Sequence, residues 1–234
     1  YGDLFMRVLY RTRPYERFPG SAELLYEKWM KRAKDNMDTG NRRTFRKIIH
    51  GIVRDFDRLE LLPIKKPKVG VVGEILVKYH PTANNDIVTI LEQGGAEAVV
   101  PDLMDYFLYS TFNSRFRFRY LAGTKLDMKK GDIARAYIMS YRNIMVQELK
   151  KSKRFTTPTS IEELAELAGT IVSLGNQTGE GWLVTAEMAE FMEQGVKNII
   201  CVIDYDPGIS SVNQLNRIKL LLSIAENGHE SIVE

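Results

Sequence analysis

Two amphipathic helical patterns open the chain. In the first, over residues 19–37, Ser21 is placed as the N-cap and apolar side chains recur at helical spacing at Leu24, Leu25, Trp29 and Met30. The second, over residues 41–59, has an apolar stripe formed by Phe45, Ile48, Ile49, Ile52, Val53 and Phe56. Because the polar faces of both are basic, we expect the two helices to pack on a larger body through their apolar faces.

From residue 61 onward the pattern alternates between apolar strands and amphipathic helices. The run "KVGVVGEILV" is typical of a buried parallel strand, and "AEAVVPD", "TIVSLG" and "KNIICVIDYD" predict further strands. Between and after them, helices are predicted for "NNDIVTILEQGG", "DIARAYIMSYRNIMVQELKKSKR", "IEELAELAG", "WLVTAEMAEFMEQG" and "VNQLNRIKLLLSIAEN". We therefore expect an α/β fold: a Rossmann-like parallel sheet with helices on both faces in residues 66–234, and an N-terminal helical appendage in residues 1–65.

Composition narrows the class of protein. The 234 residues include one cysteine, Cys201, and three scattered histidines, which do not give the spacing of a zinc or iron–sulfur site. A single cysteine fits a reducing compartment, so we expect a cytoplasmic protein.

No apolar run approaches the roughly 20 residues that span a bilayer, and the charged N-terminus is not typical of a signal peptide. Since the first residue is Tyr1 rather than methionine, we expect a fragment of a larger parent protein.

Charge is unevenly distributed along the chain. Residues 1–66 carry 16 Lys and Arg against 9 Asp and Glu, a net charge of +7, whereas residues 67–234 carry 17 against 21, a net charge of −4. A basic segment of this kind attracts anions such as nucleotides, CoA or nucleic acid, although it equally suits a solvated helical surface.

Two loops that follow predicted strands are candidate ligand-binding sites, because ligands of open α/β sheets bind at the carboxyl ends of strands. The first, "KYHPTANND", contains His80, Asn84 and Asn85, and it leads into a helix whose N-terminus could face an anion or a polar ligand. The plainer interpretation is that an asparagine caps the helix and His80 lies on the surface.

The second loop, "GNQTGEGW", matches neither the phosphate-binding P-loop nor the dinucleotide fingerprint. Its glycines permit close backbone approach to a ligand, and its polar groups could bind one. The candidate ligand-binding residues are Gly175, Asn176, Gln177, Thr178, Gly179 and Glu180. We expect residues 80–85 and 175–180 to face one cleft at the carboxyl edge of the sheet.

Two further segments admit a functional and a structural interpretation. In "SRFRFRY", arginines alternate with aromatic residues, and an extended strand would present Arg115, Arg117 and Arg119 on one face, as in proteins that bind single-stranded nucleic acid. Core packing with an arginine edge that faces solvent or CoA explains the segment better, so a nucleic-acid partner is not expected. "IDYDPG" offers two aspartates for metal or acid–base chemistry, but Asp-Pro-Gly is a common turn.

Three long segments resemble one known family. These are "KPKVGVVGEILVKYHPTANNDIVTILEQGGAEAVVPDLMDYFLY", "IVSLGNQTGEGWLVTAEMAEFMEQGVKNIIC" and "IDYDPGISSVNQLNRIKLLLS", with "YRTRPYERFPGSAELLYEKW" as a helical lead-in. They are similar to the C-terminal portion of 2-hydroxyacyl-CoA dehydratase-like proteins, also described as CoA-enzyme activase-related. The resemblance implies Rossmann-like units, a [4Fe–4S]-type cluster held by cysteines in the parent protein, and an ATP-dependent activator that supplies low-potential electrons.

The chain departs from the family pattern at the cluster cysteines. In the family, one of them lies in a Pro-Phe-x-Cys-Leu-Pro-Asn-His stretch after the strand that matches "NIIC", whereas Val202 here continues directly into Ile203. Another family cysteine is matched by Ser110, and Cys201 matches no ligand position. The residues that would hold the cluster are therefore not in this chain, and the resemblance names no catalytic residue and no metal ligand in it.

Taken with the fold, the resemblance predicts a component of a 2-hydroxyacyl-CoA dehydratase-like iron–sulfur system that acts on a CoA ester or another small substrate. The expected partner is the activator or the rest of the parent polypeptide, and a homodimer is a further expectation. The alternative is a cluster-free scaffold or interaction domain of an activase-related protein, which docks the activator through the basic N-terminal helices. The substrate cannot be read from the sequence.

Overall fold

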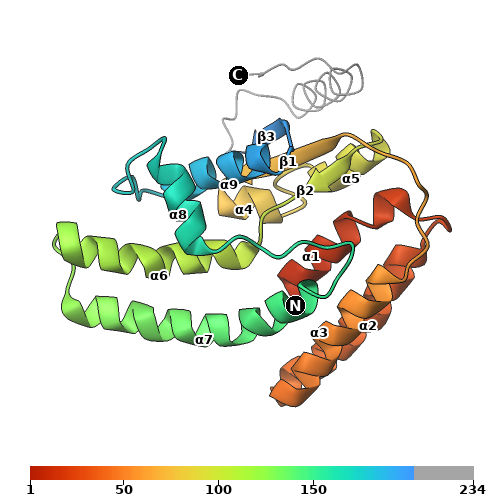
Figure 1. The fold of residues 1–234 in the computed structure, drawn as a ribbon, viewed down its shortest axis with the longest axis horizontal. Coiled ribbons are helices and arrows are strands. Elements are labelled where there is room, and N and C mark those ends of the chain that lie inside the picture. Colours follow the sequence, from red (N-terminus) through yellow and green to blue (C-terminus); the bar gives the residue numbers. More distant parts are fainter. Residues whose placement is uncertain (203–234) are drawn as a thin grey trace. The chain divides into compact units, whose positions relative to one another are not determined.

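The computed structural model of the chain describes residues 1–202 (Figure 1). Within this range it is a mixed α/β structure with a small, open, three-stranded parallel sheet and many helices. The α/β class predicted from the alternation of apolar patterns is thereby confirmed. The "IDYDPG" turn and the predicted closing helix lie outside the described residues.

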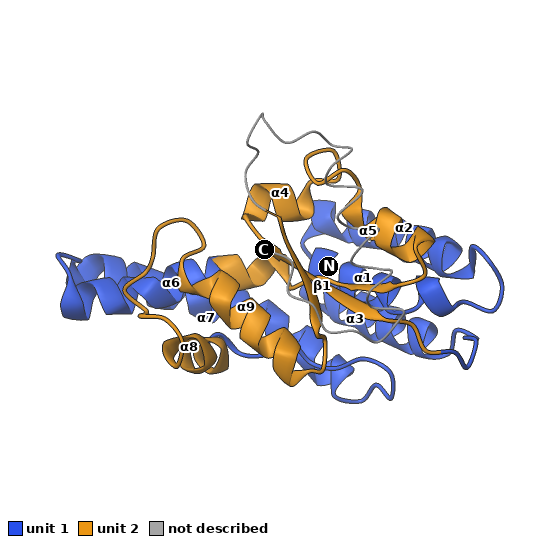
Figure 2. Ribbon diagram, turned by 90° about the horizontal axis from the view of Figure 1, so that it is seen from above, with its two compact units in different colours: residues 1–64, 107–161 blue, residues 65–106, 162–234 orange. Residues whose placement is uncertain are grey.

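The chain divides into two compact units, and each unit is assembled from two separate stretches of sequence (Figure 2). Unit 1 consists of residues 1–64 and 107–161, and unit 2 of residues 65–106 and 162–234. One division falls between residues 64 and 65, close to residue 61, where the alternation of strand and helix patterns begins. The second stretch of unit 1, which follows the second predicted strand, joins the N-terminal helices and shares their core.

Unit 1 is helical. Its elements are α1 (Gly2–Tyr10), a 3₁₀ turn η1 (Arg13–Tyr15), α2 (Ser21–Thr39), α3 (Arg42–Asp57), most of α6 (Leu103–Tyr120) and α7 (Lys125–Leu149). The predicted stripe of α3 is buried in a core shared by α1, α2 and the C-terminal part of α7, with members that include Phe5, Trp29, Ile49, Phe56 and Met145. Burial of such side chains stabilises each by about 1.5–3 kcal/mol, which explains why the basic helices fold as part of a larger core.

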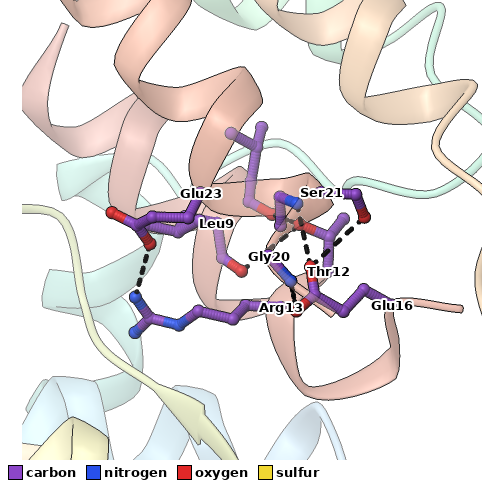
Figure 3. A network of polar contacts seen from close by, with 9 residues as sticks. Leu9, Thr12, Arg13, Glu16, Gly20, Ser21 and Glu23 are labelled. Carbon is purple, nitrogen blue, oxygen red and sulfur yellow. Dashed lines mark hydrogen bonds and ion pairs between the residues drawn. The ribbon is translucent and has the colours of Figure 1, made fainter. Parts of the chain in front are cut away.

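The start of α2 differs from the prediction (Figure 3). Ser21 is the first residue of the helix, and the N-cap is Gly20, whose φ of +86° suits glycine. The capping acceptor is the carboxylate of Glu16, which accepts hydrogen bonds from the backbone N–H groups of Gly20 at 2.6 Å and Ala22 at 2.8 Å. The negative charge of Glu16 also interacts favourably with the positive end of the helix dipole.

Unit 2 contains the sheet, in the order β2-β1-β3, with both pairs of strands parallel. Its strands are β1 (Lys68–Gly73), β2 (Glu97–Val99) and β3 (Asn198–Val202), and its helices are α4 (Ile75–Tyr79), α5 (Ile87–Gln93), α8 (Ile161–Gly169) and α9 (Trp182–Glu193). Two strand predictions are corrected. The run "KVGVVGEILV" leaves the sheet at Gly73 and turns into α4, and "TIVSLG" forms turns after α8.

The arginine-rich segment does not take the extended conformation that would put its arginines on one face. The segment from Arg115 to Tyr120 is helical, and since neighbours two apart lie about 200° apart around a helix, Arg117 does not share a side with Arg115 and Arg119. The predicted helix at "WLVTAEMAEFMEQG" is α9, in which Trp182 is buried and Met192 is 68% exposed. The buried face of α9 is formed by Trp182, Leu183, Ala186, Glu187 and Phe191.

Along residues 1–202, no helix combines the length and the apolar character that crossing a bilayer requires.

Candidate functional site

The glycine loop and the segments that follow β1 and β2 come together at the carboxyl edge of the sheet in unit 2. β1 and β3 pair in register as far as Gly73 and Val202, so both strands end at the same edge. α4 begins immediately after β1, and Tyr79 at its last turn donates a hydrogen bond of 3.0 Å to the carbonyl of Pro101, which follows β2. The segments that follow β1 and β2 are thereby tied together at this edge.

Gly73 makes the sharp exit from β1 possible. Its φ is +124°, and a Cβ atom built on it would lie 1.9 Å from the carbonyl oxygen of Val202. That carbonyl accepts the N–H of Glu74 at 2.8 Å, so the two backbones are in direct contact at the end of the sheet. Only glycine combines this backbone conformation with such a close approach.

The side chain of Glu180 joins the glycine loop to the segment that follows β1. Its Oε1 accepts the backbone N–H of Ile75, the first residue of α4, at 2.9 Å. The N-cap residue Glu74 accepts the N–H of Val77 at 2.8 Å. Two carboxylates therefore occupy the N-terminus of α4, so this helix end is already satisfied and is not open to a phosphate.

In the first candidate loop, residues 80–85, one asparagine holds the backbone through hydrogen bonds, whereas other polar residues are exposed. Asn84 donates to the carbonyls of Val77 and Lys78 at 2.9 and 3.0 Å and accepts the N–H of Ile87 at 3.2 Å, so it joins the end of α4 to the start of α5. His80 and Asn85 are exposed. Asn85 has a φ of +55°, in the left-handed region that asparagine tolerates.

The second candidate loop is held by its own backbone. The carbonyl of Asn176 accepts the N–H of Trp182 at 2.9 Å, and the side-chain amide of Gln177 donates to the carbonyl of Leu174 at 3.1 Å. Gly179 has a φ of +60° with open space where a Cβ would stand. Gly175, Asn176, Thr178 and Gly179 are exposed, whereas Gln177 and Glu180 are partly buried. The Glu180 hydrogen bond connects this loop to α4, and α4 leads directly into the loop of residues 80–85.

A buried ion pair lies behind these loops. Lys78 of α4 donates through Nζ to both carboxylate oxygens of Glu187 of α9, at 2.7 and 2.8 Å, and the two side chains are 3% and 2% exposed. Burial raises the pKa of Glu187 to about 7 from its usual 4.5; Lys78 opposes this rise, and Glu190 and Glu180 add to it. Glu187 can therefore exchange its proton near neutral pH, but the burial of the pair keeps it from direct contact with a ligand.

The single cysteine of the sequence, Cys201, interacts electrostatically with Lys78 and Glu187. Cys201 lies in β3 and is exposed as a residue, yet partial burial of its thiol raises its pKa, and the Glu187 carboxylate raises it further. A thiol with a raised pKa is protonated at neutral pH, and the thiolate is the form that binds metals.

The described residues do not fit an iron–sulfur cluster. Such clusters are usually held by four cysteine thiolates, and the whole sequence has one cysteine. Within residues 1–202, no three histidine, cysteine, aspartate or glutamate side chains converge as a metal site would require. Ser110, which matches a cluster cysteine of the resembling family, is an exposed residue of α6.

Sequence reasoning missed Lys78, Glu187 and Gly73. A signal for Glu187 was present, because it lies four residues from Leu183 and from Phe191 and therefore on the apolar face of its helix. A charged residue at such a position predicts a buried partner. No comparable pattern identifies Lys78, since the run "GEILVKY" was interpreted as a strand and its loop.

Comparisons with models of known protein families, with curated proteins and with solved structures give no match to this chain.

Proposed function

We propose that the chain is a component of a 2-hydroxyacyl-CoA dehydratase-like iron–sulfur system, which receives low-potential electrons from an ATP-dependent activator and acts on a CoA ester or another small substrate. The resemblance of the sequence to 2-hydroxyacyl-CoA dehydratase-like proteins supports the assignment to this system. The hydrogen bond between Glu180 and Ile75 supports the site, because it joins the two segments most similar to the family at the carboxyl edge of a parallel sheet.

In this proposal the chain supplies a wall of the substrate site and no cluster ligand. The residues that would contact a ligand are exposed polar residues of the two loops, such as His80, Asn176 and Thr178. The cluster ligands come from a different polypeptide of the system or from another part of a longer parent protein. The proposal includes a Rossmann-like sheet with helices on both faces, an N-terminal helical appendage and a cytoplasmic location.

A second function, a cluster-free scaffold or interaction domain of an activase-related protein, is favoured by one observation. The single cysteine, Cys201, cannot hold a cluster by itself. In that case the carboxyl edge of the sheet binds no CoA ester, and the basic helices of unit 1 dock the activator.

The experiment that separates the two functions is the binding of a short 2-hydroxyacyl-CoA, such as lactyl-CoA, to the purified chain by isothermal titration calorimetry. The proposed function predicts saturable binding that Thr178→Trp weakens at least tenfold, because the new side chain fills the space in front of the glycine loop. Thr170→Trp is the control, since Thr170 is also an exposed threonine of unit 2 but follows α8 outside both loops.

Absence of binding, or equal weakening by the two variants, would refute the proposed site and favour the scaffold. Anaerobic incubation with ferrous iron and sulfide adds an independent check. We expect no visible absorbance from a cluster, and a stable cluster on the isolated chain would contradict the assignment of the cluster ligands to another polypeptide or segment.

A further inference from the structure

The apolar stripe of α7 continues beyond the part of the helix that the core of unit 1 covers. The stripe begins at Leu126, and Ile133, Tyr137 and Ile144 follow it by 7, 11 and 18 residues. At 100° per residue, these spacings place all four side chains within about 20° of one line along the helix. Ile144 belongs to the core and is 9% exposed, whereas Leu126, Ile133 and Tyr137 are 62%, 72% and 67% exposed. One face of α7 is thus buried at its C-terminal end and uncovered over its first three turns.

The cover ends where α3 begins. Arg42, the first residue of α3, donates to the carbonyl of Ser140 at 2.8 Å, and His50 pairs with Glu148 at 2.8 Å, so α3 and α7 run in the same direction side by side. Arg42 also lies over the ring of Tyr141, at 4.9 Å. The stripe from Leu126 to Tyr137 therefore extends past the N-terminal end of α3, in line with the place that α3 occupies further along.

α6 contacts a different side of α7. A Cβ on Gly131 would lie 2.3 Å from Oγ of Ser114, so Gly131 marks the side of α7 that faces α6. Gly131 is five residues from Leu126, which places it about 140° around the helix from the stripe. The contact with α6 therefore leaves the stripe uncovered, in agreement with the exposure of its three side chains.

Positive charge borders the uncovered stripe. Lys129 and Lys130 lie on either side of it, and Lys125 lies at the start of the helix. None of these three lysines forms an ion pair with another described residue. The acidic residues of the same turns are already engaged: Asp127 accepts from Thr124 Oγ1 at 2.6 Å at the helix cap, and Asp132 pairs with Arg115 at 2.7 Å.

We infer that residues 126–137 of α7 form a docking face for an amphipathic helix of a partner protein that carries acidic residues beside its apolar stripe. Such a helix would lie along the first three turns of α7, as α3 lies along the last turns. The apolar side chains of the stripe would meet its apolar face, and the bordering lysines would meet its carboxylates. This inference is independent of the proposed function.

The charge and the width of the stripe argue for this occupant. Two copies of the face would bring like charges together, which is unfavourable. A helix that lies on a membrane surface presents a broad apolar face, whereas the exposed large apolar residues of α7 follow one narrow line with lysines close on both sides. A single helix matches both the line and the charges.

The test uses the whole chain and a fluorescent peptide of about 18 residues, acetylated and amidated, with leucines at helical spacing and glutamates beside them. We expect saturable binding in fluorescence anisotropy, weakened at least tenfold by Ile133→Asp and reduced by added salt. A peptide with lysines in place of the glutamates should bind at least tenfold more weakly. Leu24→Asp is the matched control, because Leu24 is 69% exposed on α2, away from the stripe, and its replacement should leave binding unchanged.

Several outcomes would overturn the inference. They are absence of binding, equal binding of the two peptides, and equal effects of Ile133→Asp and Leu24→Asp in variants whose circular dichroism matches the wild type. Sedimentation that shows a dimer lost on Ile133→Asp would assign the face to a second copy. Binding to phosphatidylserine vesicles that Ile133→Asp abolishes, without peptide binding, would assign it to a membrane.

Discussion

Replacing Glu187 with glutamine tests how the buried pair with Lys78 affects stability. Glutamine keeps the shape of the side chain and an oxygen that accepts from Lys78 Nζ, but it cannot ionise. The pKa of Glu187 is about 7 in the folded chain and about 4.5 when the group is free in water. The folded state therefore binds the proton more tightly than the unfolded state does.

The sign of the pH dependence follows from this difference. Below about pH 4.5 Glu187 is protonated in both states, and its stabilising contribution is fully present. Between about pH 4.5 and pH 7 the unfolded state loses the proton first, so the free energy of unfolding falls as pH rises and levels off above pH 7. A pKa raised from 4.5 to about 7 corresponds to about 3.5 kcal/mol over the whole titration, because one pH unit is worth about 1.4 kcal/mol.

The assay is urea unfolding of the wild type and of Glu187→Gln at several pH values from 5 to 8. We expect the wild type to lose about 2.5 kcal/mol relative to the variant over this range, since part of the total loss occurs below pH 5. Groups that titrate in both proteins cancel in the comparison. The pKa values of Asp55 and Glu148 are lowered by neighbouring cations, against the effect of their own burial, so their contributions are lost only below about pH 4.

The opposite sign would refute the reasoning. If the attraction of Lys78 outweighed burial, the pKa of Glu187 would lie below 4.5, and the variant would become less stable relative to the wild type as pH rises. Lys78→Met gives a second check. Loss of the lysine removes the influence that lowers the pKa of Glu187, so the fall in stability should extend to a higher pH than in the wild type.

Two further predictions concern the backbone. Glu16→Gln should lower the free energy of unfolding by about 1 kcal/mol because it removes a charged acceptor at the start of α2, whereas Glu60→Gln, at an exposed pair 3.9 Å from Arg17, should cost less than about 0.5 kcal/mol in the same urea titration. Gly73→Ala should cost at least about 2 kcal/mol because of the contact with the Val202 carbonyl, and Gly179→Ala, with open space at a φ of +60°, only about 1 kcal/mol; equal costs would contradict the account of the strand exit.

Periodicity was enough to predict most of the elements. The stripe from Phe45 to Phe56 gave α3 and its buried face, and the β-branched run after Pro67 gave β1, because both patterns follow directly from which side chains must leave water. Glycine pairs and caps also indicated the end of α5 at Gly94. These features depend on neighbours close in sequence.

Features that depend on distant residues were missed. Ser21 has the chemistry of an N-cap, but a carboxylate five residues earlier, on Glu16, takes that role through the fold of the intervening turn. Alternation of arginine and aromatic residues from Arg115 to Tyr120 would separate the two kinds of side chain only in an extended strand, whereas the segment is helical as part of α6, which packs beside α7 at Ser114. Of the candidate site, the loops were predicted, but the hydrogen bond that joins the glycine loop to the start of α4 was not, because Glu180 and Ile75 are 105 residues apart.

The buried pair raises the question of whether it serves stability or function, and a double replacement answers it. Buried ion pairs can often be exchanged for apolar residues of similar volume without loss, because desolvation offsets their attraction. A pKa of about 7 for Glu187 shows that burial outweighs the attraction of Lys78. We therefore expect Lys78→Met with Glu187→Leu to be at least as stable as the wild type in urea unfolding at pH 8, although each change alone destabilises. If the double variant loses more than about 2 kcal/mol, the pair is part of the architecture that holds α4 against α9. If it is stable but no longer binds the CoA ester, the ionisable pair is required at the carboxyl edge for a reason other than folding.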